Sequence, residues 1–542
     1  MRPRADLLIA NGRVWRGGPG ADGADAVAVA GGRVLAVGRA AELEPLAGPA
    51  TVRLDAGGAT VTPGLVDAHL HLVAWARARD EVALAGAASR HEALARVAAF
   101  LAAADDPGPV VGRGWDDHGW SEPPDRASLD AVSGERPVLL HRRDYHALWV
   151  NGAALRAAGV TRDRPDPPGG RIERDAAGEP SGVVREHAVR LFAPLLEAGV
   201  RGSDAGRLAA AMRILHAQGI TAVHDFEDLE AIRLLRALQR EAAGPRLRVV
   251  AHLPEAGLDA ALARGLVSGA GDDWFRYGAL KLFADGTLGS RTAALLAPYE
   301  GSADAGMDLV PPAELARTAC RAAAGGIAVA VHAIGDRAVR AALDAIEAAA
   351  AAGPPPALPS RVEHAQLVDA ADLPRFARLG AWASMQPTHC VSDIESAERD
   401  WGGRVERSYP WRDLLDAGAT LLFGSAAPVE PPRPAAWLHA AVTRQRADGT
   451  PPGGFTPRQR LGLDEALRAC TVGGPAFPAV PAAAGARGGV APGAPADLVV
   501  WDADLHGLPA SLLHEARPAC TLLAGGIVHR EPVGVAHPPS SP

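Results

Sequence analysis

The stretch Tyr277-Gly-Ala-Leu-Lys-Leu-Phe-Ala-Asp285 is an apolar run of the kind that forms a buried β-strand. It contains Lys281, the only lysine among 542 residues; lysine and arginine together number 55, so the other 54 are arginine. A charged lysine is costly in a buried strand unless it is paired or chemically altered. Arginine cannot be altered chemically in this way, because it stays protonated in a protein, whereas the lysine amine can lose its proton near neutral pH. Lys281 is therefore a candidate functional residue, and an accidental survivor of drift toward arginine is the alternative.

Seven further apolar runs share this character and alternate with helical patterns. In chain order the eight runs are Ala59–Ala68, Gly219–Phe226, Leu247–Leu253, Tyr277–Ala284, Gly326–Ala333, Arg361–Ala365, Gly380–Gln386 and Ala419–Gly424. The helical patterns include Asp204–Gln218, Leu229–Ala243, Pro312–Ala324 and Arg337–Ala351. Strands that alternate with helices favour a parallel sheet, and eight such units predict an α/β fold of the (β/α)8 TIM barrel type. A doubly wound open sheet is the alternative, but no GxGxxG follows the first run.

The two chain ends and one long gap predict further parts. Short strand-like runs near both ends predict a small β-sandwich domain from residues 1–58 and 486–542. The barrel would take residues 59–71 and 203–485. Residues 72–202 are too many for one βα connection, so we expect an inserted subdomain there. An insertion after strand one lies over the C-terminal mouth of a barrel, where active sites sit, and we interpret it as a substrate lid.

Composition narrows the classes of partner. The net charge is −8, with acids and arginines interspersed and no basic block, which argues against a nucleic-acid or anionic membrane surface. No apolar run approaches membrane-spanning length, and polar residues come too early for a secretory signal. The four cysteines form no CxxC pair, which argues against a disulfide framework or a thiolate zinc site. We expect a cytoplasmic protein that acts on a small-molecule substrate. The sequence leaves open whether it forms a homodimer.

Four histidines and the single lysine lie late in predicted strands. Two of the histidines close the stretch Pro63–His71, and histidines two apart on a strand point to one side. The carboxyl ends of barrel strands meet at one rim, where imidazoles suit a divalent metal. A buried histidine is more often a satisfied core residue, but four of them with the only lysine on one rim predict a metal site. The set is His69, His71, Lys281, His332 and His364.

These motifs resemble the amidohydrolase superfamily, and most closely its YtcJ-like or amidohydrolase 3 family, which includes N-substituted formamide deformylases. Pro63–His71 resembles the family's PGxxDxHxH motif, and Lys281–Ala293 resembles its KxxxDGSLGSRTA signature. Tyr145–Leu155, His332–Ala338 and Arg361–Gln366 resemble other stretches of the family. The resemblance covers nearly the whole chain.

The resemblance implies a metal-dependent hydrolase that cleaves a C–N bond, amide or N-acyl, of a small apolar or aromatic molecule. It implies that His69 and His71 bind one divalent ion, that His332 and His364 bind a second, and that Lys281, carbamylated by CO2, bridges both. Zinc suits this imidazole-rich set, although manganese or iron could also fit. A cyclic-amide or amidine hydrolase, or a deaminase, is the alternative reaction. A non-catalytic metal-containing binding protein is the alternative from another class.

One position departs from the family pattern. The family ends strand eight with GSDxPV, but Gly424–Val429 reads Gly-Ser-Ala-Ala-Pro-Val, so Ala426 stands where the catalytic aspartate is expected. That aspartate contacts the first metal and shuttles a proton, and such acid–base help is worth about 10²–10⁴ in rate. We therefore expect a much impaired enzyme. Three explanations stay open: a deliberate Asp→Ala change made to trap substrate, a natural variant that uses another acid or runs another reaction, and a natural pseudoenzyme that binds without turnover.

Four residues are candidates for contacting the substrate. Asp285 and Arg291 lie in the loop after Lys281 and could hold a polar group or brace the loop through a salt bridge. His146 and Trp115 come from the insertion and are expected to line the mouth. Simple packing is the alternative for the tryptophan.

Overall fold

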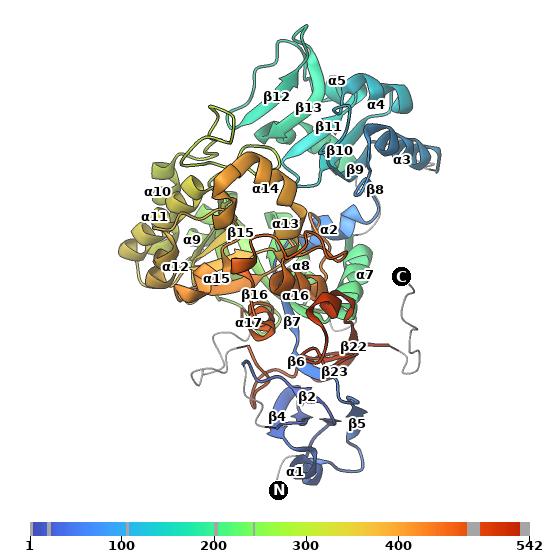
Figure 1. The fold of residues 1–542 in the computed structure, drawn as a ribbon, viewed down its shortest axis with the longest axis vertical. Helices are drawn as coiled ribbons and strands as arrows, with labels where there is room; N and C mark the ends of the chain where they lie inside the picture. The colour runs from blue at the N-terminus through green and yellow to red at the C-terminus, as the bar shows by residue number, and fades with distance from the viewer. Residues whose placement is uncertain are drawn as a thin grey trace.

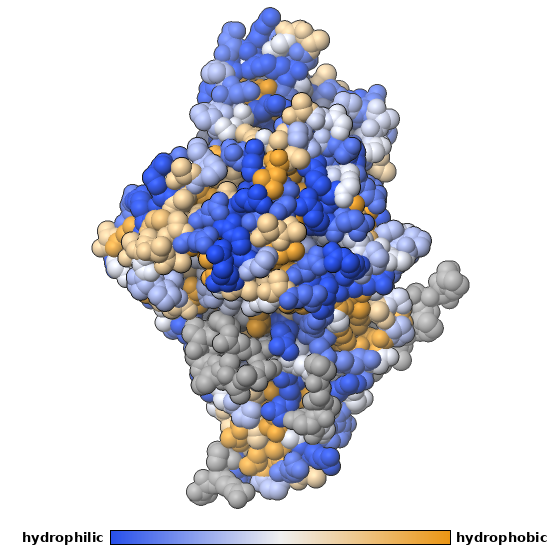
Figure 2. Space-filling view, turned by 60° about the vertical axis from the view of Figure 1, so that its left-hand side comes forward, coloured by the Kyte–Doolittle hydropathy of each residue, from blue (hydrophilic) through white to orange (hydrophobic). Residues whose placement is uncertain are grey.

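The computed structural model describes residues 4–18, 23–103, 108–199, 204–241, 244–473 and 488–531. Three parts follow one another along the long axis: an inserted sheet, a barrel, and two small sheets formed near the chain ends (Figure 1). On the face shown in Figure 2, hydrophobic side chains are interspersed with hydrophilic ones. Among the helices of the described residues, none is long and apolar enough to cross a membrane.

An eight-stranded parallel sheet forms the centre of the molecule. Its strands are β7 (Leu65–Leu70), β14 (Ile220–Phe226), β15 (Arg248–Pro254), β16 (Phe275–Phe283), β17 (Val329–Ala333), β18 (Arg361–His364), β19 (Trp382–Met385) and β20 (Thr420–Phe423). Strands adjacent in this order are paired in the sheet, and a parallel bridge between Leu70 and Ala427 links its two ends. The predicted (β/α)8 TIM barrel is therefore confirmed.

Amphipathic helices cover the outside of the barrel (Figure 1). They include α7 (Asp204–Ala217), α8 (Leu229–Leu238), α10 (Pro312–Ala324) and α11 (Asp336–Ala352). The helix α10 begins with proline, whose missing N–H is not needed in a first turn. The helix α8 ends at Leu238, earlier than the predicted Ala243, and residues 242–243 lie outside the described residues.

The first predicted run, Ala59–Ala68, is divided between two sheets. Its first half is β6 (Thr60–Pro63), which pairs with β21 (Leu498–Trp501) from the other end of the chain, and its second half begins β7. Gly64 lies between them, and a Cβ there would come within 2.1 Å of Thr221 Oγ1. The prediction of one continuous strand is wrong, because an apolar run does not reveal where the chain changes sheet.

Two small sheets lie beside the amino ends of the barrel strands (Figure 1). The five-stranded sheet combines β6 and β21 with β2 (Arg13–Val14), β22 (Pro518–Leu523) and β23 (Gly526–Arg530). The four-stranded sheet consists of β1 (Leu7–Ala10), β3 (Ala26–Ala30), β4 (Arg33–Gly38) and β5 (Val52–Asp55). The domain boundaries expected at residues 202–203 and 485–486 fall outside the described residues.

A six-stranded sheet lies between β7 and β14 in the chain and at the opposite end of the molecule from the small sheets (Figure 1). Its strands are β8 (Val82–Ala83), β9 (Val110–Trp115), β10 (Val138–Arg142), β11 (Ala147–Val150), β12 (Gly170–Arg174) and β13 (Pro180–Glu186). Side chains cap two of its helices: Asp125 accepts from the Ser128 N–H at the start of α4 (Arg126–Ser133), and Asn151 accepts from the Ala154 N–H at the start of α5 (Gly152–Ala157).

Candidate metal centre

The five side chains predicted to bind metal meet at the carboxyl end of the barrel. His69 and His71 stand at the end of β7, Lys281 lies late in β16, His332 lies in β17, and His364 ends β18. The imidazole centroids of His69 and His364 are 4.9 Å apart, and those of His332 and His364 are 4.6 Å apart. The centroids of His69 and His71 are 5.7 Å apart. The fold therefore gathers four histidines from three strands around one point.

Each of the four imidazoles has one nitrogen held by an oxygen acceptor. The contacts are His69 Nδ1 with Glu363 (2.7 Å), His71 Nδ1 with the Phe226 carbonyl, His332 Nε2 with the Gly286 carbonyl (3.0 Å) and His364 Nδ1 with Gln386 Oε1 (2.7 Å). A carbonyl or carboxylate oxygen only accepts, so the nitrogen that faces it carries the proton. The other nitrogen of each ring then carries the lone pair that a metal needs, which is the arrangement typical of metal-binding histidines.

Burial sets the charge of these groups. It lowers the pKa of all four imidazoles below the ordinary value for histidine, and that of His71 to about 4, so the rings are neutral at pH 7. Burial also lowers the pKa of Lys281 to about 8. The amine lies 4.8 Å from the centre of the Phe226 ring and 4.9 Å from that of Phe283. A fraction of Lys281 is therefore neutral near pH 7, and a neutral amine is the form that can react with CO2.

The donor set fits two divalent ions only if Lys281 takes part. Throughout the part of the chain that the structure describes, no group of three or more histidine, cysteine, aspartate or glutamate side chains is arranged to hold a metal ion by itself. The histidines form two pairs, whereas catalytic sites of this kind usually have three protein ligands per ion. Lys281 is the further side chain beside both pairs that could complete a metal site.

Ala426 lies beside the first histidine pair. Its backbone N–H donates to the His69 carbonyl (2.7 Å), and the His71 N–H donates to the Ala427 carbonyl (2.8 Å). Ala426 has φ 55°, in the left-handed region, where aspartate and asparagine are several-fold enriched among non-glycine residues. The backbone at position 426 therefore suits the aspartate expected from the resemblance better than it suits alanine.

Two buried charges that the sequence reasoning missed support His69. Glu363 is fully buried, and Arg361 donates to its carboxylate and to His224 Nδ1 (2.9 Å). Burial alone would raise the pKa of Glu363, but Arg361 and then Lys281 hold it below its ordinary value, so the carboxylate is ionised. A signal was available, because Arg361 and Glu363 are two apart on a strand and so share one face.

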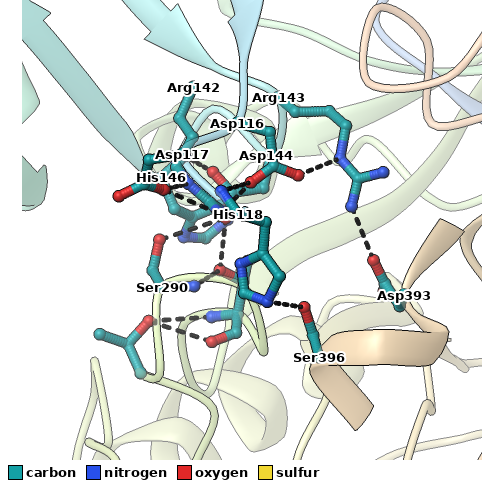
Figure 3. Close-up of polar contacts among 12 residues, drawn as sticks. Asp116, Asp117, His118, Arg142, Arg143, Asp144, His146, Ser290, Asp393 and Ser396 are labelled. Carbon is teal, nitrogen blue, oxygen red and sulfur yellow. Dashed lines mark hydrogen bonds and ion pairs between the residues drawn. The ribbon is translucent and has the colours of Figure 1, made fainter. Parts of the chain in front are cut away.

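A polar cluster ties the insertion to the barrel mouth (Figure 3). Arg142 at the end of β10 donates to Asp116 (2.7 Å) and Asp144 (2.9 Å). Asp144 in turn accepts from the hydroxyls of Thr287 (2.9 Å) and Ser290 (3.1 Å), in the loop after β16. Burial alone would raise the pKa of Asp144, but Arg142 holds it well below its ordinary value. Asp144 is therefore ionised, and the cluster links the insertion to the loop that follows Lys281.

A second link runs to the opposite side of the mouth (Figure 3). Arg143 donates to Asp393 (2.9 Å), between α13 (Pro387–Ser392) and α14 (Ile394–Trp401). His118 Nε2 lies 3.3 Å from Ser396 Oγ in α14. The insertion is thus fastened across the carboxyl end of the barrel.

The substrate-contact candidates occupy different environments. His146 lies at the mouth: its ring centroid is 5.5 Å from that of His332, and its Nδ1 is 2.6 Å from Glu186. Burial alone would lower the pKa of His146, but Glu186 raises it to about 9. Arg291 is partly exposed, and its guanidinium is 3.4 Å from Asp400.

The other two candidates are fully buried, and the Asp285 carboxylate lies 3.7 Å from His332 Nε2. The Asp285 carboxylate is fully buried and accepts from the N–H groups of Ala294, Ile334 and Gly335, so it braces the loop through backbone bonds rather than through a salt bridge with Arg291. Trp115 is fully buried and donates to the Leu140 carbonyl inside the insertion. Both side chains make structural hydrogen bonds here, and their role as substrate contacts stays a prediction.

Comparison with known proteins agrees with the geometry. A family model described as Amidohydrolase family matches residues 53–529. YtcJ of Bacillus subtilis, named as an amidohydrolase, is 30% identical over 96% of this chain and 99% of its own length. An N-substituted formamide deformylase of Arthrobacter pascens is 29% identical over 93% of this chain and 94% of its own. The crystal structure of a metal-dependent hydrolase from Pyrococcus horikoshii superposes with a TM-score of 0.71 at 27% identity, covering 91% of this chain and 96% of that one.

Proposed function

Because this chain belongs to the amidohydrolase family, we propose that it is a metal-dependent hydrolase that cleaves the C–N bond of an amide or N-acyl small molecule. The observation that carries the proposal is the meeting of four oriented, neutral histidines with the single lysine at the carboxyl end of the barrel. The formamide deformylase relative supports an N-acyl substrate.

The residues that would hold metal are the two histidine pairs and Lys281. His69 and His71 would hold one divalent ion, His332 and His364 the other, and a carbamate on Lys281 would contribute to both. When bound, such ions polarise a carbonyl oxygen and lower the pKa of water toward neutrality. The imidazole-rich donor set suits zinc.

The chain's own groups orient and enclose this centre. Glu363 fixes the tautomer of His69, and Gln386 does the same for His364. The links from Arg142 and Arg143 hold the insertion over the mouth, where it limits access of bulk water. Hydrolysis adds water across the C–N bond, with the hydroxyl going to the carbonyl carbon and the proton to the leaving nitrogen. Ala426 has no proton to deliver, so we propose that this last transfer is slow.

The test is a panel of formamides and other N-acyl amines, with release of free amine as the readout. We expect slow release that stops after treatment with a chelator and returns when zinc is added back. Release that is insensitive to the chelator would contradict a metal-dependent reaction.

Ala426 also supports a second candidate, a metal-containing protein that binds amides without turning them over. The two candidates are distinguished by following bound amide over time with the metal in place. Recovery of unchanged amide after many hours, together with measurable affinity, would favour the binding protein.

A further inference from the structure

A row of four aromatic rings crosses the barrel mouth from the end of β16 to α13, the short helix after β19. The ring of Phe283 is 5.4 Å from that of His332, His332 is 4.6 Å from His364, and His364 is 6.2 Å from His389. The two inner rings belong to proposed metal ligands, whereas the two outer rings have no part in holding metal. A molecule whose reacting bond lies over the inner rings would meet Phe283 on one side and His389 on the other.

Phe283 is an aromatic side chain that is exposed to solvent close to the proposed metal ligands. It is 38% exposed, although it ends a strand in which the five preceding residues are buried. Lys281 and Phe283 are two residues apart on β16, so they share one face, and Phe283 lies further out toward solvent. Its ring is therefore an apolar surface beside the reacting centre.

The opposite end of the row carries polar atoms that lack partners. Among the described residues, Gln386 Nε2, Thr388 Oγ1 and His389 Nε2 are buried side-chain atoms that make no hydrogen bond. His389 is only 9% exposed, and its ring is nearly parallel to that of His364. Buried polar atoms in native proteins are nearly always paired, so these three atoms, within four residues beside the proposed ligand His364, are available to hydrogen-bond a bound molecule.

We propose that these two ends form the substrate-binding groove, with an apolar group of the substrate on Phe283 and a hydrogen-bonding group of the substrate at His389 and Thr388. This inference rests on the proposed function and gives it a substrate class. The substrate is an amide with an apolar, flat or branched group on one side of the scissile bond and a second hydrogen-bonding group on the other.

Hydroxamates test the groove without any need for hydrolysis, because the hydroxamate group binds divalent metals directly. Calorimetry on the zinc-loaded chain would compare acetohydroxamate with benzohydroxamate, which adds a ring, and with the hydroxamate of N-acetylglycine, which adds a second amide. We expect benzohydroxamate to bind about tenfold more tightly than acetohydroxamate, from burial of the ring. The second amide should contribute about fivefold.

Each preference should depend on one end of the row. Phe283→Ala should abolish the preference for the ring, while Val267→Ala, an exposed apolar residue that precedes β16 at the other end of the barrel, should retain it. His389→Ala should abolish the preference for the second amide, while His91→Ala, an exposed histidine of the insertion, should retain it. If His389→Ala does not fold or bind zinc, Thr388→Val is measured in its place.

Either preference absent from the unmodified chain, or surviving its own variant, would overturn the proposal. The proposed function can fail separately. Hydroxamates that bind with both preferences to a chain that hydrolyses no amide would establish the groove and refute the hydrolase. Amide hydrolysis by a chain with neither preference would establish the hydrolase and refute the groove.

Discussion

The two ends of the barrel differ in what they enclose. The carboxyl end gathers four histidines and the only lysine under the insertion (Figure 1). The amino end borders a cavity of about 1160 Å³ between the barrel and the small sheets, and the described residues that line it include no histidine and no lysine. Its walls are largely apolar, with side chains such as Phe376 and Ile327, and its arginine at position 248 is neutralised by Asp497.

This contrast shows that volume alone does not locate chemistry. The carboxyl end holds oriented lone pairs and a lysine with a lowered pKa, whereas Arg248 at the amino end forms an ion pair with Asp497. The difference follows from strand direction, because the loops that follow the strands carry function in a TM barrel and the opposite face contributes stability.

Restoring an acid at the carboxyl end should have the largest effect. Ala426→Asp should raise kcat by about 10²–10⁴ on any amide that the chain hydrolyses, the range for a positioned acid–base group. Ala426→Asn is the matched control, because asparagine also tolerates the left-handed backbone but cannot shuttle a proton. Equal rates for the unmodified chain and Ala426→Asp would mean that another acid serves this enzyme.

Removing a large side chain at the amino end should affect stability and leave the chemistry intact. Phe376, fully buried in α12 (Leu373–Leu379), lines the cavity. Phe376→Ala should lower the free energy of unfolding by about 3–5 kcal/mol, measured by urea denaturation, with unchanged metal content. Phe283→Ala should cost much less, because that ring is 38% exposed. Loss of metal in Phe376→Ala would contradict the division between the two ends.

Weakening the hydrogen bond that orients one proposed metal ligand, His69, should have an intermediate effect. Glu363→Gln weakens the acceptor that fixes His69, so zinc affinity should fall by about 10–100-fold in a competition assay with a chelator. Ser384→Ala is the control, because Ser384 accepts from Arg361 and has no contact with His69 among its hydrogen bonds. A similar loss in both variants would assign the effect to general damage of the barrel interior.

The smallest effect concerns pH and a carboxyl group on the connection into the insertion. Burial raises the pKa of Glu81 from its ordinary 4.5 to about 7, against the weaker opposing effect of Arg113. Because the folded-state value is the higher one, its contribution to stability is present below pH 4.5 and is lost as the pH rises through 7. Glu81→Gln should therefore reduce the fall in unfolding free energy between pH 4.5 and 7. An identical pH profile for both chains would show that Glu81 is not perturbed.

The barrel and the candidate metal ligands could be predicted from the sequence for one physical reason. A buried strand leaves a continuous apolar run, and a lysine or histidine in such a run stands out, as Lys281 and His332 do. The boundary between two strands at Gly64 could not be predicted, because the residues on both sides are equally apolar and only their pairing strands differ. The hydrogen bonds of the buried Asp285 and Trp115 side chains could not be predicted either, since they depend on contacts between distant segments.

We propose that Lys281, carbamylated, completes a two-ion centre at the carboxyl end of the barrel. Elemental analysis of purified chains tests it most directly, with Lys281→Arg compared against the unmodified chain and against Arg248→Lys, a basic exchange at the amino end. We expect up to two divalent ions per chain in the unmodified protein and in Arg248→Lys, and the loss of at least one ion in Lys281→Arg. Equal metal content in all three chains would contradict it.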